Sequence, residues 1–581
     1  MPEPFSPTAL FEFPDLGSET SRVCFANPSA VYEARILPEV LLSLQRAEQA
    51  SREGRWVVIV LSYEAAPAFD SAFRVNARTD FPLSWVAVFG EPCPPPEECW
   101  PKSEGLSWKP MISRAEYLQS VAGIRNFIAL GDSYQVNYTF PLCCQWEDDS
   151  WSWYCRLRGA QNAPYCSWID LGRYQILSLS PELFFQRRGT RLLVRPMKGT
   201  APRGLNAMDD DNLKKKLQAS SKDRAENVMI VDLLRNDLGK ISLPGSVQVT
   251  HLCQVEQYPT LFQMTSTIES TCTAETSLGD IMQALFPCGS VTGAPKIRSM
   301  ELIREFEPYP RNVYTGAIGL LRPGGDCTFN VAIRTALVDK ETRQAVFGVG
   351  SGITWESSAE DEYEECLLKA RFLTQPPVRF QLVETLRLES GSYFLLEPHL
   401  DRMRQSARYF GFAWDERVVR AALEEKRLEH PNDSWRIRLL LAKDGRPETQ
   451  VAHLTPLATQ EWRVAIAADP VASQDLFLYH KTTHRQLYHD QMQRRPDCDD
   501  LIFWNERGEV TESSRANVVL IAQGEKWTPP VRSGLLAGTY RNELLSRGEI
   551  RERVFYKEDL RQATAVFLIN SVRKWIPVAL V

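Results

Sequence analysis

The sequence predicts a protein of mixed α and β structure, and three patterns support this. Residues 56–64 (WVVIVLSYE) form an apolar run of the length of a buried strand. Residues 114–130 have the apolar spacing of a helix that ends at Gly131. Further along, the β-rich runs 313–321, 328–338 and 345–349 are joined by short polar turns. We therefore expect an antiparallel meander there rather than a βαβ series.

The chain divides into two regions near residue 377. Pro376 and Pro377 follow a helical segment, DEYEECLLKARFL, and precede a strand-like run at 380–388. Consecutive prolines end helices and resist central strands, so this point is a natural linker. We expect one domain over 1–377, with 1–107 as its amino-terminal part, and a second domain over 378–581.

Composition excludes several classes of protein. The 581 residues are 44% hydrophobic and 24% charged, as in ordinary globular proteins, and the formal charge of −6 is small for this length. A near-neutral chain argues against nucleic-acid binding or a basic membrane face. The 13 cysteines form no C-x-x-C pair, the amino terminus lacks signal-peptide features, and no apolar stretch approaches the ~18 residues of a membrane span. We expect a cytoplasmic enzyme with reduced thiols.

Two predicted helices each carry a pair of carboxylates. Asp223 and Glu226 are three residues apart, and so are Glu362 and Glu365, so each pair lies on one helix face. Two such helices could hold Mg²⁺, a hard cation that prefers oxygen ligands. Acidic pairs on helices are more commonly solvated faces. Spacing alone leaves both interpretations open.

Several blocks surround these pairs in a distinctive order. They are GDSYQVNYT (131–139), SPELFF (180–185), RPMKGTAPRG (195–204), AENVMIVDLLRNDLG (225–239), PCGSVTGAPKIRSMELI (287–303), YTGAIG (314–319), NVAIRTA (330–336) and GSGITWESSAEDEYEECLLKA (350–370). From about Trp108 to Leu373 the chain resembles the chorismate-utilising enzymes: anthranilate synthase component I, aminodeoxychorismate synthase component I and the isochorismate synthases. The resemblance implies an antiparallel β-sandwich with helices.

The resemblance also implies a metal site. Glu226 and Glu365 would ligate Mg²⁺, and Asp223 and Glu362 would act through waters. The metal would bind a carboxylate of chorismate and help the ring hydroxyl to leave, which is Lewis-acid chemistry.

Substrate contacts follow from the same resemblance. The implied residues are Thr200, Gly293, Ala294, Tyr314, Arg334, Gly350, Ser351, Gly352 and Lys369. Arg334 and Lys369 would bind carboxylates, together with backbone N–H groups of 350–352. In isolation, Arg334 would be interpreted as part of a cross-strand ion pair.

Lys198, in the block Pro-Met-Lys-Gly-Thr, distinguishes members of this family. Anthranilate synthases carry Ala at the matching position, whereas aminodeoxychorismate synthases carry a nucleophilic Lys. That lysine adds to the chorismate ring as the 4-hydroxyl leaves, and ammonia then displaces it. The chemistry needs a neutral amine, so burial or neighbouring cations must lower the pKa of Lys198. The alternative is an exposed lysine in a turn.

One block departs from the family pattern. Gln263 stands where many members have His. An amide can hydrogen-bond the leaving hydroxyl but cannot protonate it, so a metal-bound water or a carboxylic acid would have to do so.

The second region carries four blocks of its own. They are LEPHLDRMRQSA (396–407), YHKTTHR (479–485), GEVTESSRANV (508–518) and SGLLAGTYR (533–541). They resemble the fold-type IV pyridoxal-phosphate (PLP) enzymes, which include branched-chain and D-amino-acid aminotransferases and aminodeoxychorismate lyases. By that resemblance Lys481 bonds to PLP and Glu512 keeps the pyridine nitrogen protonated. Arg402, Gly538 and Thr539 would bind the phosphate where a helix begins. Taken singly, these residues would be a solvated lysine, a surface arginine and a turn.

Two features refine this second resemblance. The glycine-rich strand that precedes the Glu384-Thr385-Leu-Arg387 block in the family is absent, and PPVRF (376–380) takes its place. Near the end, VFLINSVRKWIPV (566–578) is closer to the lyases than to the aminotransferases.

Together the two regions predict a fused aminodeoxychorismate synthase component I and aminodeoxychorismate lyase. It would convert chorismate and ammonia to 4-amino-4-deoxychorismate and then to 4-aminobenzoate and pyruvate, for folate biosynthesis. No Gly-x-Cys-x-Gly nucleophile turn is present, so a separate glutamine amidotransferase subunit would supply the ammonia. Fold-type IV domains often form homodimers. The alternatives are an anthranilate synthase fused to an aminotransferase, against which Lys198 speaks, and a non-catalytic regulatory protein that keeps both folds.

Overall fold

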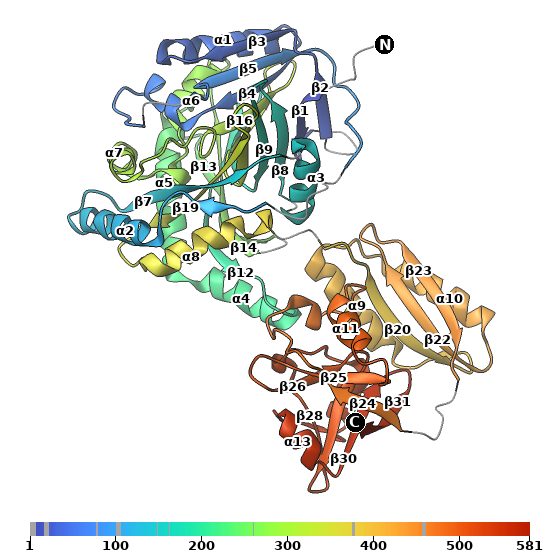
Figure 1. Ribbon diagram of the computed structural model, residues 1–581. Coiled ribbons are helices and arrows are strands. Elements are labelled where there is room, and N and C mark those ends of the chain that lie inside the picture. Colours follow the sequence, from blue (N-terminus) through green and yellow to red (C-terminus); the bar gives the residue numbers. More distant parts are fainter. Residues whose placement is uncertain are drawn as a thin grey trace. The chain divides into compact units, whose positions relative to one another are not determined.

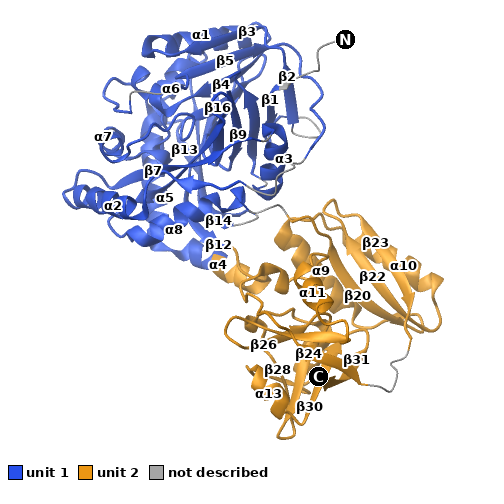
Figure 2. Cartoon of the chain, viewed as in Figure 1, with its two compact units in different colours: residues 1–202, 214–377 blue, residues 203–213, 378–581 orange. Residues whose placement is uncertain are grey.

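The computed structural model describes residues 7–16, 22–76, 80–99, 106–147, 149–161, 163–258, 261–374, 378–455 and 461–581. The chain forms two compact units, one of residues 1–202 and 214–377 and one of residues 203–213 and 378–581 (Figure 2). The predicted linker at 375–377 lies outside the described residues. None of the described helices is long and apolar enough to cross a membrane.

The first unit is built on two large antiparallel sheets (Figure 1). The nine-stranded sheet has the order β15 (Gly293–Ala294), β7 (Gln135–Gln145), β19 (Gln344–Ile353), β18 (Thr335–Asp339), β9 (Tyr174–Ser180), β8 (Tyr165–Asp170), β1 (Pro7–Glu12) and β2 (Arg22–Ala26), with β6 (Lys109–Pro110) paired to β7. The ten-stranded sheet has the order β12 (Met197–Pro202), β14 (Leu261–Thr271), β11 (Arg191–Arg195), β10 (Leu183–Arg188), β17 (Cys327–Val331), β16 (Ala317–Leu321), β4 (Trp56–Leu61), β5 (Ser84–Phe89) and β3 (Ala30–Ala34), with β13 (Gln248–Gln257) paired to β14.

These sheets pack face to face as a sandwich. Phe11 and Ile176 of the nine-stranded sheet share one buried cluster with Val58 and Ile318 of the ten-stranded sheet. The expected β-sandwich is confirmed. The continuous apolar run in β4 is explained, because both faces of this strand are covered.

Helices cover the outer faces of the sandwich. The buried cluster over the ten-stranded sheet includes residues of α1 (Leu37–Arg52), α5 (Ser221–Gly239) and α6 (Leu278–Leu285). The cluster over the nine-stranded sheet includes residues of α2 (Arg114–Ala129), α3 (Ser150–Gln161), α7 (Lys296–Phe306) and α8 (Ala359–Ala370). The helix predicted at 114–130 is therefore confirmed as α2. Its start is fixed by a capping box between Ser113 and Glu116.

The predicted meander is wrong in one respect. The sequence predicts a single strand over 328–338, but the chain leaves the ten-stranded sheet at Val331 and enters the nine-stranded sheet at Thr335. Between them Arg334 has a φ of 51°, in the left-handed region, which interrupts the extended backbone. The two hairpins, β16–β17 and β18–β19, thus belong to different sheets. Apolar pattern could not reveal the break, because the strands on both sides of it are buried.

The second unit combines a small and a large sheet. The four-stranded sheet has the order β21 (Ser392–Tyr393), β20 (Leu382–Glu389), β22 (Ser434–Leu441) and β23 (Pro447–His453), and shares a core with α9 (Leu396–Phe410) and α10 (Glu416–Glu429). The eight-stranded sheet has the order β26 (Val510–Ser513), β25 (Asp500–Trp504), β24 (Trp462–Ile466), β31 (Lys574–Leu580), β30 (Ala565–Asn570), β27 (Asn517–Ala522), β28 (Glu525–Thr528) and β29 (Arg551–Glu552). The remaining helices of this unit are α11 (Gln486–Gln493), α12 (Thr539–Ser546) and α13 (Lys557–Gln562). Helix α4 (Ala207–Ala219) is divided between the units, since residues 207–213 belong to the second and 214–219 to the first.

Candidate active sites

The first candidate site is centred on Lys198, in the edge strand β12. The pairing of β12 with β14 shifts between Met197 and Thr200, so the strand bulges at the lysine. Such a bulge re-aims the side chain it carries. Gly199 has a φ of 90°, and a Cβ there would lie 2.9 Å from the Cβ of Asp223, so only glycine lets β12 approach α5 this closely.

Buried surroundings and nearby charges act on the Lys198 amine. Burial lowers its pKa below the usual value, Glu226 opposes that shift, and Lys369 adds to it. Glu182 and Glu365 also lie within electrostatic reach of the amine. A lowered amine pKa is what a nucleophilic lysine requires.

Glu182 is a functional candidate to which the sequence interpretation gave no role. It immediately precedes β10, it is buried, and its Oε1 has no hydrogen-bond partner among the described residues. Burial raises the pKa of Glu182 to about 7, although Ser290 and the positive charge of Lys198 oppose the shift. A carboxyl group with this pKa can give up a proton near neutral pH. The signal available in the sequence was an acidic residue beside the apolar run Leu-Phe-Phe.

Gln135, at the start of β7, is a second candidate that the sequence interpretation did not single out. Its side chain is only 1% exposed, and neither its Nε2 nor its Oε1 has a partner in the described part of the chain. A Cβ on Gly352 would lie 1.9 Å from Gln135 Nε2 and 3.1 Å from Lys198 Nζ. The missing side chain of Gly352 therefore leaves room for both the Gln135 amide and the Lys198 amine. A buried amide with no partner is costly unless a ligand pairs with it.

Several predicted substrate residues lie next to Gln135, Gly352 or Lys198. Gly293 and Ala294 form β15 and pair with Val136 and Gln135 of β7. Lys369 donates to the carbonyl of Gly350 at 2.9 Å and forms an ion pair with Glu365 at 2.7 Å. Ser351 Oγ lies 3.1 Å from Tyr117 OH, and Thr200 Oγ1 donates to Gln263 Oε1 at 3.1 Å.

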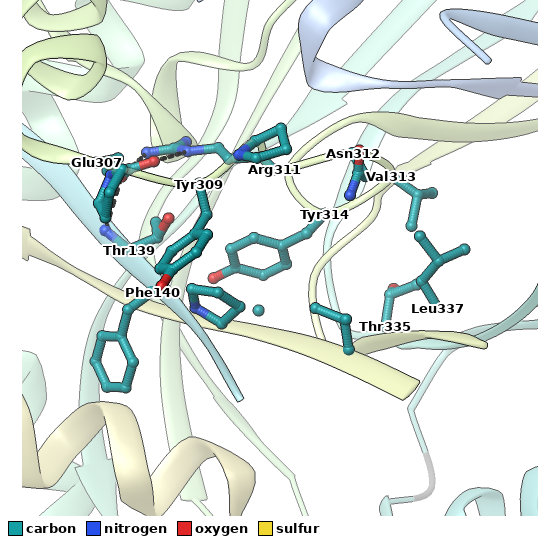
Figure 3. A pocket seen from close by; sticks show the side chains of 15 residues that line it. Thr139, Phe140, Glu307, Tyr309, Arg311, Asn312, Val313, Tyr314, Thr335 and Leu337 are labelled. Atoms are coloured by element: carbon teal, nitrogen blue, oxygen red, sulfur yellow. Dashed lines mark hydrogen bonds and ion pairs between the residues drawn. The ribbon is translucent and has the colours of Figure 1, made fainter. Parts of the chain in front are cut away.

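Arg334 and Tyr314 make their contacts elsewhere. Arg334 donates to Gln161 Oε1 at 2.6 Å, and burial lowers its pKa to about 10. The Tyr314 ring packs against Gly348 and borders a cavity of about 30 Å³, beside the buried ion pair of Arg311 and Glu307 (Figure 3).

The predicted metal ligands come from α5 and α8. Burial raises the pKa of Glu226, and the negative charges of Asp223 and Glu362 add to the shift. Glu365 pairs with Lys369, and Glu362 accepts from Ser357 Oγ at 2.7 Å. No group of three or more His, Cys, Asp or Glu side chains within the described ranges is arranged to hold a metal ion. Mg²⁺ usually binds one or two carboxylates together with substrate oxygens, so this donor set fits Mg²⁺ in the presence of an anionic substrate.

The second candidate site is centred on Lys481, which follows a short 3₁₀ turn, Leu476–Leu478. Burial lowers the pKa of Lys481 to about 8; Arg402 and Arg485 add to the shift, and Glu384 and Glu512 oppose it. The cavity beside Lys481 is lined also by Arg402, Glu512, Gly538 and Thr539, so the structure brings all five predicted PLP-binding residues together.

Glu512 lies in β26 and takes part in a buried hydrogen-bond network. Its Oε1 accepts from Tyr488 OH at 2.8 Å, and its Oε2 accepts from the backbone N–H of Leu536 at 3.1 Å. Burial raises its pKa to about 7, with Tyr488 and Arg485 opposing. A cationic ring nitrogen is the partner that such a carboxylate lacks.

Arg402 lies beside the start of α12. Arg402 Nη1 donates to the carbonyl of Ala537 at 3.0 Å, one residue before Gly538, which caps α12. A Cβ on Gly538 would lie 2.0 Å from Asn517 Oδ1, so a side chain there would require Asn517 to move. A guanidinium beside a helix N-terminus suits a phosphate. With Lys481 and Glu512 in the same cavity, the residues present fit PLP.

Comparison with known proteins finds a separate family match for each of the two regions. Residues 94–375 match the family model of the chorismate binding enzymes, and residues 381–581 match that of class IV aminotransferases. The chain is thus a chorismate-binding region fused to a class IV aminotransferase region, a type that uses PLP. It belongs to the chorismate-binding enzyme family as a homologue of aminodeoxychorismate synthase component 1. The predicted family resemblance and fold class are confirmed.

Three relatives illustrate the match. The aminodeoxychorismate synthase component 1 of Salmonella typhimurium is 39% identical over 343 residues, which is 58% of this chain and 70% of that protein. The Escherichia coli protein of the same name is 38% identical over 269 residues, 46% of this chain and 59% of that protein. The crystal structure of anthranilate synthase component I from Streptococcus pneumoniae superposes with a TM-score of 0.52 at 26% identity, covering 64% of this chain and 93% of that one.

Proposed function

We propose that the first region makes 4-amino-4-deoxychorismate from chorismate and ammonia, and that the second converts this product to 4-aminobenzoate and pyruvate. The observation that carries the proposal is Lys198: a lysine of lowered pKa stands among carboxylates at the position that separates aminodeoxychorismate synthases from anthranilate synthases. The similarity to aminodeoxychorismate synthase component 1 supports the same choice.

At the first site, the neutral amine of Lys198 adds to the chorismate ring while the 4-hydroxyl leaves. Glu182, with a pKa of about 7, gives the departing hydroxyl its proton, a role that Gln263 cannot take. Ammonia then attacks the ring carbon that carried the hydroxyl, and the C–N bond to Lys198 breaks. The unpaired amide of Gln135 would orient the ammonia, because its oxygen accepts and its NH₂ group donates.

Mg²⁺ would be held by Glu226 and Glu365, with Asp223 and Glu362 acting through waters. Bound there, it would neutralise a substrate carboxylate and favour loss of the hydroxyl. Lys369 would bind a second carboxylate. The ammonia would come from a separate glutamine amidotransferase subunit, as the component 1 name of the relatives suggests.

At the second site, PLP would supply an electron sink when bound to Lys481. Arg402, Gly538 and Thr539 would hold its phosphate, and Glu512 its ring nitrogen. The Lys481 amine would remove the C4 proton of aminodeoxychorismate. Loss of this proton would let the enolpyruvyl group leave as enolpyruvate, which takes up a proton to become pyruvate, and the ring would become aromatic. With a pKa of about 8, the Lys481 amine is partly neutral at physiological pH and can accept that proton.

Product analysis tests the proposal. The full chain is incubated with chorismate, ammonium, Mg²⁺ and PLP, and the products are separated by chromatography. We expect 4-aminobenzoate and pyruvate from the wild type, and neither from Lys198→Ala. Anthranilate as the product would contradict the proposal and favour the alternative fusion. Full-rate aminodeoxychorismate synthesis by Lys198→Ala would remove Lys198 as the nucleophile.

A further inference from the structure

A buried carboxylate joins the two elements of the proposed phosphate site. Glu384, in β20, is 1% exposed. Its Oε1 accepts from Arg402 Nε at 2.8 Å and its Oε2 from Arg402 Nη2 at 2.8 Å, so the ion pair is bidentate. The same Oε2 lies 2.6 Å from His399 Nδ1. An ionised carboxylate only accepts hydrogen bonds, so the Nδ1 of His399 carries the proton.

His399 extends this contact to the start of α12. It stands three residues before Arg402 on the same face of α9, and it is 1% exposed. Its Nε2 lies 3.2 Å from Thr539 Oγ1. Burial lowers the pKa of His399, against the opposing charge of Glu384, which favours the neutral ring. In that form Nε2 is an acceptor, and the Thr539 hydroxyl donates to it.

The pairing of Glu384 with Arg402 and His399 has a physical reason. A guanidinium and a helix N-terminus that face one anion repel each other when the anion is absent, and Arg402 also acts on the nearby Lys481 amine. A buried carboxylate is itself unfavourable unless it is paired and hydrogen-bonded. Arg402 and His399 supply those partners, and they hold the pKa of Glu384 well below its usual value in spite of its burial.

We propose that Glu384 and His399 are positioning residues of the phosphate site. Glu384 fixes the guanidinium plane of Arg402 through two bonds. Through His399 it also fixes Thr539, the first residue of α12. The outer N–H groups of Arg402 and the N-terminus of α12 thereby converge on one anion. This inference rests on the proposed PLP site and adds to it the group that shapes its anion-binding end.

Comparison of PLP with pyridoxal, which lacks the phosphate, tests the role of Glu384. Dissociation constants for both are measured by absorbance on the full chain, for the wild type and for Glu384→Gln. We expect the variant to bind PLP about 10- to 100-fold more weakly, as for other supporting residues of binding sites, while pyridoxal affinity stays within about threefold. Glu389→Gln, on the same strand with a 45% exposed side chain, is the matched control and should bind both as the wild type does.

Two outcomes would overturn this role. One is unchanged PLP affinity in Glu384→Gln; the other is an equal loss of affinity for PLP and pyridoxal, which would mean a general structural defect. A wild-type chain that bound neither compound would instead refute the proposed PLP site itself, so the two failures are distinguishable.

The His399–Thr539 link has its own test, which does not depend on folding of the Glu384 variant. Thr539→Val keeps the side-chain volume but removes the hydroxyl, whereas Thr539→Ser keeps the hydroxyl. We expect Thr539→Val to lose PLP affinity about tenfold and Thr539→Ser to retain it. His399→Asn should lose a similar factor, and the double variant His399→Asn/Thr539→Val no more than either single change. Full additivity, or wild-type PLP binding by His399→Asn, would show that Thr539 acts without His399.

Discussion

Lys198 and Lys481, one in each unit, are buried amines with different electrostatic surroundings. Burial lowers both pKa values. At Lys198 the strongest neighbouring charge is Glu226, which favours the charged amine; at Lys481 it is Arg402, which favours the neutral amine and brings the pKa to about 8. A base has to be neutral, and a pKa of about 8 leaves part of the Lys481 amine in that state near neutral pH. At Lys198 the carboxylates of Glu226, Glu182 and Glu365 instead oppose the lowering of the pKa by burial.

The largest expected effect follows from the separate roles of the two lysines. Lys198→Ala should stop aminodeoxychorismate synthesis, and Lys481→Ala should stop its conversion to 4-aminobenzoate, each by about 10³-fold or more. Because each variant keeps the other site, a mixture of the two should make 4-aminobenzoate from chorismate by release and recapture of the intermediate. Liquid chromatography of the products follows both steps.

A mixture with no activity would contradict this independence. The control is each variant alone at twice the concentration, which should accumulate aminodeoxychorismate in Lys481→Ala and unreacted chorismate in Lys198→Ala.

Substitution of Glu182 should have the next largest effect on activity. Glu182→Gln removes the proposed acid while keeping the side-chain volume, and we expect ammonia-dependent synthesis to fall about 10²-fold or more. Burial raises the pKa of Glu182 to about 7, so the acid form prevails below that pH and is lost above it. The rate limb that declines above about pH 7 should therefore disappear in the variant. Glu275→Gln, at an exposed position, should leave the profile unchanged.

The pH dependence of stability separates Lys481 from an ordinary surface lysine. Its folded pKa is about 8, below the ~10.4 of an unfolded lysine, so between these values the unfolded chain binds more protons. The PLP-free protein should therefore gain stability as pH rises from about 8 to about 10, by up to about 3 kcal/mol relative to Lys481→Met. Urea unfolding at several pH values measures the difference. A constant difference across this range would show that the pKa is not lowered.

The residues that the sequence revealed lie in local motifs, whereas those that it did not reveal depend on contacts between distant parts of the chain. Lys198, Lys481 and the predicted PLP-binding blocks lie in short motifs that resemble those of known families, and strand β4 and helix α2 follow from local patterns. Gln135 and Glu182 gain their importance from long-range packing. Gly352 leaves room for Gln135 and Lys198, and burial raises the pKa of Glu182 against the opposing effects of Ser290 and Lys198. No local pattern encodes such proximity. Arg334 was visible as a charged residue, but its left-handed backbone, which moves the chain from one sheet to the other, was not.

The smallest expected effect comes from replacing the glycine near each lysine with alanine: Gly538 at the Lys481 site and Gly199 beside Lys198. At Gly538 the φ of −62° suits any residue, and the only obstacle to Ala is Asn517 Oδ1, 2.0 Å from the added Cβ. Gly538→Ala should destabilise the chain by about 1–3 kcal/mol through this overlap, and Asn517→Ala in the same chain should restore part of the loss.

Gly199 offers no such rescue. Its φ of 90° strains any side chain, and the added Cβ would also lie 2.9 Å from that of Asp223. Shortening the neighbour with Asp223→Ala leaves the neighbouring Cβ in place, so Gly199→Ala/Asp223→Ala should unfold at the same urea concentration as Gly199→Ala. Recovery of stability in this double variant would mean that crowding by the carboxylate, rather than the backbone of the bulge, requires glycine beside Lys198.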